Sequence, residues 1–125
     1  MGEVEKNLDA ISIALSGLRG QSAKTAVSAE NIANVSSSNY EAKDAVLSSN
    51  GTGVEVSVQT RQNPTFKTYS PDSALADNDG YVSVPNISLE EEAVNLLTAE
   101  IAYKANVSVI KTADEMQDSL LDVLA

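Results

Sequence analysis

The sequence predicts an α+β protein that is mainly helical, with long N- and C-terminal helices paired as an antiparallel coiled coil around a small insert rich in β-hairpins. Three observations predict this class: an apolar seam at helical spacing over 5–35, a wider apolar stripe over 89–124, and alternating residues with turn signals between them. A chain of 125 residues has the length of one domain. We therefore expect a discontinuous helical coiled-coil domain from 1–35 and 89–125, with a linker and the small β insert over 36–88.

The N-terminal helix is predicted from a row of residues at alternating three- and four-residue steps, the a/d spacing of a coiled coil, with no Pro to interrupt it. The row consists of Leu8, Ile11, Leu15, Leu18, Ser22, Thr25, Ala29 and Ile32. Each Gly inside a helix costs about 1 kcal/mol relative to Ala. Gly17 and Gly20 therefore indicate either a close approach by a neighbouring segment or a local flexible point.

The C-terminal helix is predicted to begin after Ser88, which forms a capping box with Glu91. The glutamates at 90–92 place negative charge at the positive end of the helix dipole. Its main apolar row is Val94, Leu97, Ile101, Ala105, Val109, Ala113, Met116, Leu120 and Val123. A second apolar row lies beside it, and a stripe this wide needs two neighbours. The solvated face is expected to include Glu92, Glu100, Asp114, Asp118 and Asp122.

The segment between the helices is predicted to form short strands. Val54–Gln59 alternates apolar and polar residues, and the turn signal of Asn50–Gly53 precedes it, so it is expected to pair with Ala45–Leu47 as a hairpin. Phe66–Tyr69 and Tyr81–Val84 are two further predicted strands.

The predicted helix lengths indicate an elongated molecule. At 1.5 Å per residue the helices would run roughly 45 and 54 Å, whereas a compact globule of this chain length has a radius of gyration of about 14 Å. A two-helix hairpin hides one seam of each helix, and each Leu or Ile left exposed forgoes about 1.5–3 kcal/mol. We therefore expect the isolated termini to be poorly ordered and to gain order by packing between subunits. The residues predicted to make that packing are Leu8, Ile11, Leu15, Leu18, Ile32, Val94, Leu97, Ile101, Val109, Met116 and Leu120.

Composition excludes several classes of function. The net charge of −10 argues against sequence-independent nucleic-acid binding and against an anionic membrane surface. The chain has neither Cys nor His, which excludes disulfides, thiolate or imidazole metal sites and a Ser-His-Asp triad. No run of residues is long and apolar enough to predict a membrane span, and no pattern of a cleaved signal peptide begins the chain.

The few groupings that could carry chemistry have simpler structural interpretations. Asp77–Gly80 resembles part of a calcium loop, but Leu75 and Asn86 stand where that loop needs acidic ligands, so a turn before a strand is the better interpretation. The glutamates at 90–92 are explained by the helix N-terminus. Asn31 and Asn34, three residues apart on one helix face, can be ordinary helix-end residues or a buried amide that determines how the helices align. We expect no catalytic, cofactor-binding or metal-binding residues, and hence no enzyme.

Several motifs are similar to those of the flagellar axial proteins, specifically the small proximal-rod type of the bacterial basal body. They are Leu15-Ser16-Gly17-Leu18, the Asn31-Ile32-Ala33-Asn34 run, Asp77-Asn78-Asp79-Gly80-Tyr81-Val82 leading to Pro85-Asn86, and Tyr103-Lys104-Ala105-Asn106. The resemblance covers essentially the whole chain and is weakest over 41–75. Its polar motif residues are Asn31, Asn34, Asn86, Tyr103 and Asn106.

The resemblance implies a structural rod subunit of the flagellar basal body. In that family the terminal helices pack with neighbours into a hollow tube that transmits motor torque, the C-terminal helices line its channel, and a small β domain lies outside. It implies as partners other copies of the chain, other rod proteins and, in transit, the flagellar type III exporter, which needs no cleaved signal peptide. It implies no cofactor and no small-molecule substrate. Two alternatives stay open: a subunit at another position in the rod, and a free cytoplasmic coiled-coil adaptor that is acidic and dimeric.

Overall fold

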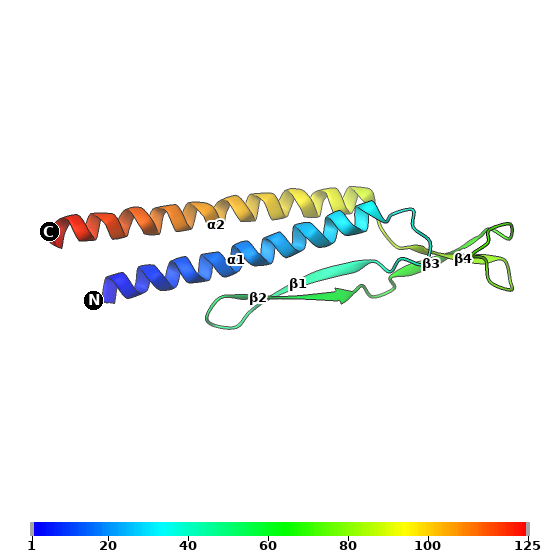
Figure 1. The fold of residues 1–125 in the computed structure, drawn as a ribbon, viewed down its shortest axis with the longest axis horizontal. Coiled ribbons are helices and arrows are strands. Elements are labelled where there is room, and N and C mark those ends of the chain that lie inside the picture. The colour runs from blue at the N-terminus through cyan, green and yellow to red at the C-terminus, as the bar shows by residue number, and fades with distance from the viewer. Residues whose placement is uncertain (1, 125) are drawn as a thin grey trace.

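The computed structural model describes residues 2–124 as an elongated molecule built on a pair of long helices (Figure 1). α1 begins and α2 ends at the same end of the pair, so the helices run antiparallel (Figure 1). We call this the open end, and the opposite end, where the hairpins connect the helices, the closed end. The predicted fold class is confirmed. The elements in chain order are α1 (Gly2–Ala33), β1 (Lys43–Ser49), β2 (Val54–Thr60), β3 (Thr65–Tyr69), β4 (Tyr81–Pro85) and α2 (Leu89–Leu124).

The two helices begin and end where local hydrogen bonds allow. α1 ends at Ala33, two residues earlier than predicted. There the side-chain Nδ2 of Asn34 donates back to the carbonyl oxygen of Glu30 at 2.9 Å. α2 begins after the predicted cap, and Ser88 Oγ accepts a hydrogen bond from the Glu91 N–H at 3.3 Å. The backbone N–H of Glu90 itself and the Ser88 hydroxyl both donate to the Glu90 carboxylate, and these bonds hold the pKa of Glu90 below its ordinary value.

Two antiparallel hairpins connect the helices. β1 pairs with β2 from Lys43 opposite Thr60 to Ser49 opposite Val54, which confirms the predicted hairpin. This hairpin lies along α1 (Figure 1). β3 pairs with β4, with Tyr69 opposite Tyr81, and this second hairpin projects beyond the closed end of the helix pair (Figure 1).

The contact between α1 and α2 is made by small and polar side chains. The buried apolar side chains of the two helices are all Ala or Val: Ala14 and Val27 on α1, Ala99 and Ala113 on α2. The prediction that the row containing Leu8 and Leu15 is the helix–helix seam is wrong for this contact. Those two side chains are exposed, while Asn7 and Ala14, one residue earlier on the helix, are buried.

Both glycines that the sequence singled out are close to neighbouring side chains. A Cβ added to Gly17 would lie 2.9 Å from the amide of Asn106 on α2. A Cβ on Gly20 would lie 3.0 Å from the Leu47 side chain and 3.2 Å from that of Val54. Close approach therefore explains both positions, with Gly17 facing the partner helix and Gly20 facing the β1–β2 hairpin.

Candidate assembly surface

A buried amide joins three parts of the chain at the closed end of the helix pair. Asn31 of α1 is 0% exposed. Its Nδ2 donates to the Lys43 carbonyl at 2.8 Å and to Glu92 Oε1 at 3.3 Å, while its Oδ1 accepts from the Tyr40 hydroxyl at 2.9 Å and the Lys43 N–H at 3.1 Å. These four bonds use the full capacity of an amide. Asn31 thus links α1 to β1 and α2. Burial of the Tyr40 hydroxyl, together with the nearby Glu30 carboxylate, raises the pKa of Tyr40.

Arg61, directly after β2, extends this cluster. Its Nη2 lies 2.8 Å from Glu92 Oε1 and 2.8 Å from Asp44 Oδ1, and its Nη1 donates to the Asn86 carbonyl at 3.1 Å. Burial opposes the charge of the guanidinium, but the bonds to Asp44 and Glu92 outweigh it and raise the pKa of Arg61 above its ordinary value. We call Asn31, Arg61 and Glu92 the polar clamp, because they connect both helices to the β1–β2 hairpin.

The clamp corrects one expectation and adds a residue that the sequence did not reveal. Glu92 was expected on the solvated face of α2, but it is 0% exposed and paired with Arg61; the other four acidic residues of that face are exposed. Arg61 was not predicted to have any role. Its only signal was that it is the single Arg within 36–88, immediately after an alternating strand.

The other polar motif residues occupy separate places. Asn34 ends α1 and accepts from the Ser37 hydroxyl at 3.1 Å. Asn86 touches the clamp through its carbonyl, and its Nδ2 donates to the Asn63 carbonyl at 3.0 Å. Asn106 packs against Gly17 midway along α2, with its Nδ2 donating to the Ala102 carbonyl at 3.1 Å. The structure thus gathers only Asn31 and Asn86 at one cluster.

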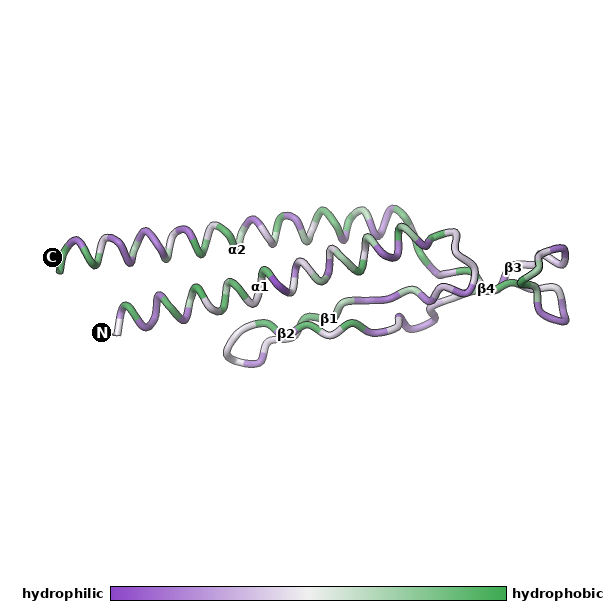
Figure 2. Tube along the Cα trace, in the orientation of Figure 1, coloured by the Kyte–Doolittle hydropathy of each residue, from purple (hydrophilic) through white to green (hydrophobic). Residues whose placement is uncertain are grey.

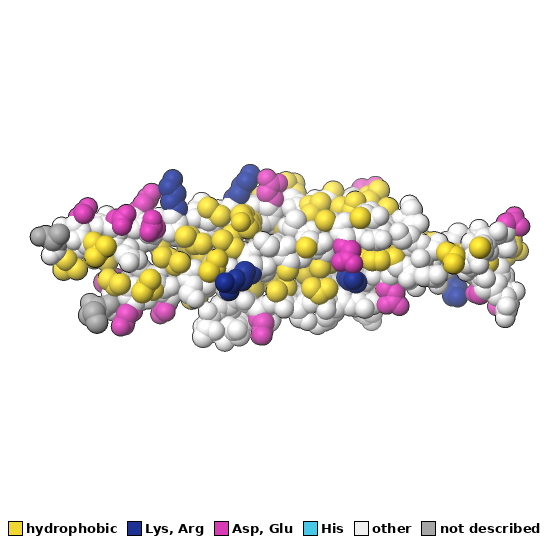
Figure 3. Space-filling model, in the orientation of Figure 1, with side chains coloured by type: hydrophobic (Ala, Val, Ile, Leu, Met, Phe, Trp, Pro, Cys, Tyr) yellow, Lys and Arg dark blue, Asp and Glu magenta, His cyan; other side chains and the backbone are white. Residues whose placement is uncertain are grey.

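Large apolar side chains cover much of the molecular surface. The accessible surface is 8205 Å², whereas a compact monomer of this mass is expected to expose about 6,400 Å². Apolar positions recur along the whole length of both helices (Figure 2), and they form patches along the helix pair in the view of Figure 3. Of the residues predicted to pack between subunits, the exposed ones are Leu8, Leu15, Val94, Leu97, Ile101, Val109 and Met116. The half-buried ones are Ile11, Leu18, Ile32 and Leu120.

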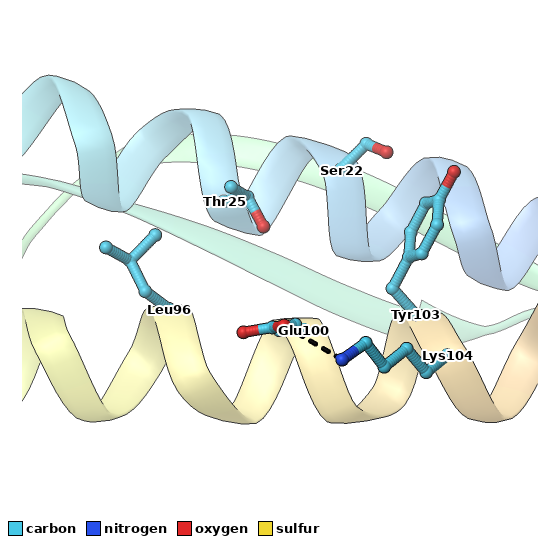
Figure 4. A pocket seen from close by; sticks show the side chains of 6 residues that line it. All are labelled: Ser22, Thr25, Leu96, Glu100, Tyr103 and Lys104. Carbon is cyan, nitrogen blue, oxygen red and sulfur yellow. Dashed lines mark ion pairs between the residues drawn. The ribbon is translucent and has the colours of Figure 1, made fainter.

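A shallow groove of about 550 Å³ runs between the helices, in the half of the pair away from the chain ends (Figure 4). Leu96 and Tyr103 point from α2 toward α1, which contributes Ser22 and Thr25 (Figure 4). Glu100 and Lys104 of α2, which also line the groove, form an ion pair with 3.0 Å between the charged atoms, and both side chains are exposed. Such a groove can receive a side chain or a helix from another molecule.

The carboxylates near Gly80 form a turn, as predicted. Asp77 Oδ1 accepts from the N–H groups of Asp79 and Tyr81, each at 2.9 Å, and Gly80 has a positive φ of 87°. These bonds, the one from Tyr81 above all, lower the pKa of Asp77. Within residues 2–124 no three acidic side chains gather as metal ligands, and no helix there is long and apolar enough to cross a membrane.

Comparison with known proteins relates most of the chain to one group. Residues 78–123 match the family model described as the C-terminal part of flagellar basal-body rod proteins FlgE, FlgF and FlgG. The flagellar basal-body rod protein FlgC of Escherichia coli O6:H1 is 37% identical, over 87% of this chain and 91% of that protein. FlgC of Salmonella typhimurium is 36% identical over the same shares, and FlgC of Borreliella burgdorferi is 31% identical over 91% of this chain and 95% of that protein.

Membership in this group fits a surface rich in exposed apolar side chains. The chain belongs to the FlgC family of flagellar basal-body rod proteins, which are structural proteins and not enzymes.

Proposed function

We propose that this rod protein assembles with copies of itself and with other rod proteins through the exposed apolar faces of α1 and α2, forming the hollow axle that transmits motor torque. In this assignment, 1–35 and 89–125 build the tube, and 36–88 form the linker and an outer β insert. The observation that carries the proposal is the mismatch between interior and surface. The buried apolar side chains of α1 and α2 are Ala and Val only, while large apolar side chains line the outside of both helices.

Burying these faces would supply a large favourable free energy, which assembly must set against the cost of association. Leu97 is 58% exposed and Ile101 is 62% exposed. Fully burying one such side chain contributes about 1.5–3 kcal/mol, so half a dozen of them contribute on the order of 10 kcal/mol per subunit. A load shared over many such contacts suits an axle, because no single contact then carries the torque.

The proposed location is the rod within the cell envelope, reached through the flagellar type III exporter without a cleaved signal peptide. The names of the relatives support the rod, and the fold is compatible with export. A helix pair whose buried apolar side chains are Ala and Val loses little on being drawn out into an extended chain. The apolar faces then become buried only at the growing end of the rod.

The test replaces apolar residues of the two helices, three exposed and one (Leu18) half-buried, in a strain whose own gene is deleted. Leu15→Asp, Leu18→Asp, Leu97→Asp and Ile101→Asp are each expected to abolish motility and rod formation in images of basal bodies. Leu97→Met keeps an apolar side chain of similar volume and is the matched control, expected to swim. Hydrogen exchange of the purified Asp variants should show that the β1–β2 hairpin stays protected, and hence folded. Motile Asp variants with complete rods would overturn the assignment.

A measurement on the purified chain separates a rod subunit from a free adaptor. A rod subunit is expected to have protease-sensitive termini in dilute solution and to gain helicity on assembly. A dimeric adaptor would instead have fully helical, protease-resistant ends when purified.

A further inference from the structure

The helix pair carries a second groove at its open end. It consists of two recesses of about 460 and 450 Å³ that share Asn7, Thr112 and Met116. Small and apolar side chains such as Ala10 and Ala113 line one recess, and the carboxylates of Glu3 and Glu115 line the other. The turn of the β1–β2 hairpin lies against α1 near Ile13 and Ser16 (Figure 1).

Asn7 is a buried polar side chain with an unmet hydrogen-bonding need. It is 8% exposed, and its Nδ2 has no hydrogen-bond partner among the described residues. Leaving such a donor unpaired costs about 1–3 kcal/mol. Asn31, the other buried asparagine of α1, has all its bonds made within the chain. Because an amide can turn about its last side-chain bond, Asn7 can direct an N–H into the groove when an acceptor arrives there.

The open end is also strongly acidic. Residues 2–9 and 111–124 carry seven acidic and two basic residues, a net charge of −5 and half of the charge of the whole chain. The last turn of α2 has no basic residue to compensate the negative end of its helix dipole. In the view of Figure 3, acidic side chains flank apolar ones at this end. The field there attracts cationic partners.

A second copy of this chain does not meet that charge. It carries the same net charge of −10, and no two of its eight basic residues lie within four positions of each other. Two copies placed with their open ends together would bring like charges into contact. A helix with Lys or Arg on both sides of an apolar row matches both the lining and the rim, and a third helix is the element that packs into a groove between two others.

We infer that the open-end groove is the docking site for a basic amphipathic helix of a different protein. The apolar row of that helix lies over Ala10, Ala113 and Met116, its cations pair with Glu3 and Glu115, and one of its acceptors receives the Asn7 amide. The inference rests on the proposed function in that the partner is then another protein of the rod or its base. The groove shares Val109, Met116 and Leu120 with the residues predicted to pack between subunits, but Leu97 does not line it, so the Leu97 variants and the groove variants can fail independently.

The test uses two labelled peptides of 18 residues, one an amphipathic helix of Leu, Ala and Lys and the other with Glu in place of every Lys. Fluorescence anisotropy with the full chain is expected to show binding of the Lys peptide that is at least tenfold tighter than that of the Glu peptide. Thr112→Trp, which fills the groove from an exposed position, is expected to weaken binding at least tenfold, and Glu115→Lys likewise. Glu55→Lys on β2 makes the same charge change away from the groove and should stay within twofold of the unaltered chain.

Each other outcome has a defined meaning. If Glu55→Lys weakens binding as much as Glu115→Lys while Thr112→Trp has no effect, the peptide binds the net charge only and the groove is not its site. If Thr112→Trp abolishes self-association in sedimentation but leaves peptide binding unchanged, the occupant is a second copy. Circular dichroism at 222 nm verifies that each variant folds. Loss of the peptide site with normal rods would overturn this inference alone, whereas motile Leu97→Asp cells would overturn only the proposed function.

Discussion

Removing the cation of the polar clamp is expected to destabilise the chain more than any other single change to a charged residue. Arg61→Met keeps most of the side-chain volume but removes the guanidinium that lies 2.8 Å from Glu92 Oε1. Glu92, 0% exposed, would then retain only the bond from Asn31 Nδ2 at 3.3 Å. A carboxylate in that position is buried without a countercharge.

The expected size of the effect follows from burial. Removing one partner of a buried ion pair costs about 3–5 kcal/mol, a large share of the roughly 5–15 kcal/mol that stabilises a typical domain. Lys67→Met is the matched control, because Lys67 pairs with Asp77 at 3.2 Å with both side chains exposed to solvent. An exposed pair of this kind contributes about 0–1 kcal/mol.

Urea unfolding followed by circular dichroism at 222 nm and by tyrosine fluorescence measures both changes, with a stabilising osmolyte added where a variant is unfolded in buffer. The double variant Arg61→Met with Glu92→Met replaces the pair by apolar side chains and is expected to recover most of the stability lost in the single variant. The reasoning is refuted if Arg61→Met costs no more than Lys67→Met, or if the double variant is less stable than the single one.

Three further changes test other contacts. Gly53→Ala should release the hairpin turn from α1, because a Cβ on residue 53 would meet Ser16 Oγ and the φ of Gly53 is 149°. The expected result is faster hydrogen exchange in β1 and β2, and unchanged exchange would contradict this. Asp77 has a folded pKa below its ordinary 3.8, so its stabilisation is present above about pH 4 and is lost as the pH falls through the lowered value. Urea midpoints measured across that range should show this loss, and Asp77→Asn should reduce the pH dependence to the part contributed by other carboxylates such as Glu90. Gly17→Ala should destabilise the chain by about 1 kcal/mol when Asn106 is present. In the Asn106→Ala background it should stabilise the chain by a similar amount, because helix propensity alone then decides. Equal urea midpoint shifts in both backgrounds would contradict the close approach.

The sequence alone determined the elements and their order. Uninterrupted helical spacing and the Ser88 cap located both helices within a few residues, because these signals are local and repeat along the chain. The alternation from Val54 onward and the turn signal before it predicted the first hairpin. The residues from Asp77 to Gly80 predicted the turn that leads into β4. The length of the helices was enough to indicate an elongated molecule.

Which side chains meet was decided only by the tertiary structure. A spacing of three and four residues describes the row of Leu8 and Leu15 as well as that of Asn7 and Ala14, and the structure turned the second row inward. Small side chains allow α1 and α2 to approach closely, and the large ones are left for contacts outside the chain. Arg61 and Glu92 are thirty-one residues apart and meet only when the hairpin folds back onto both helices, so no local pattern could have paired them.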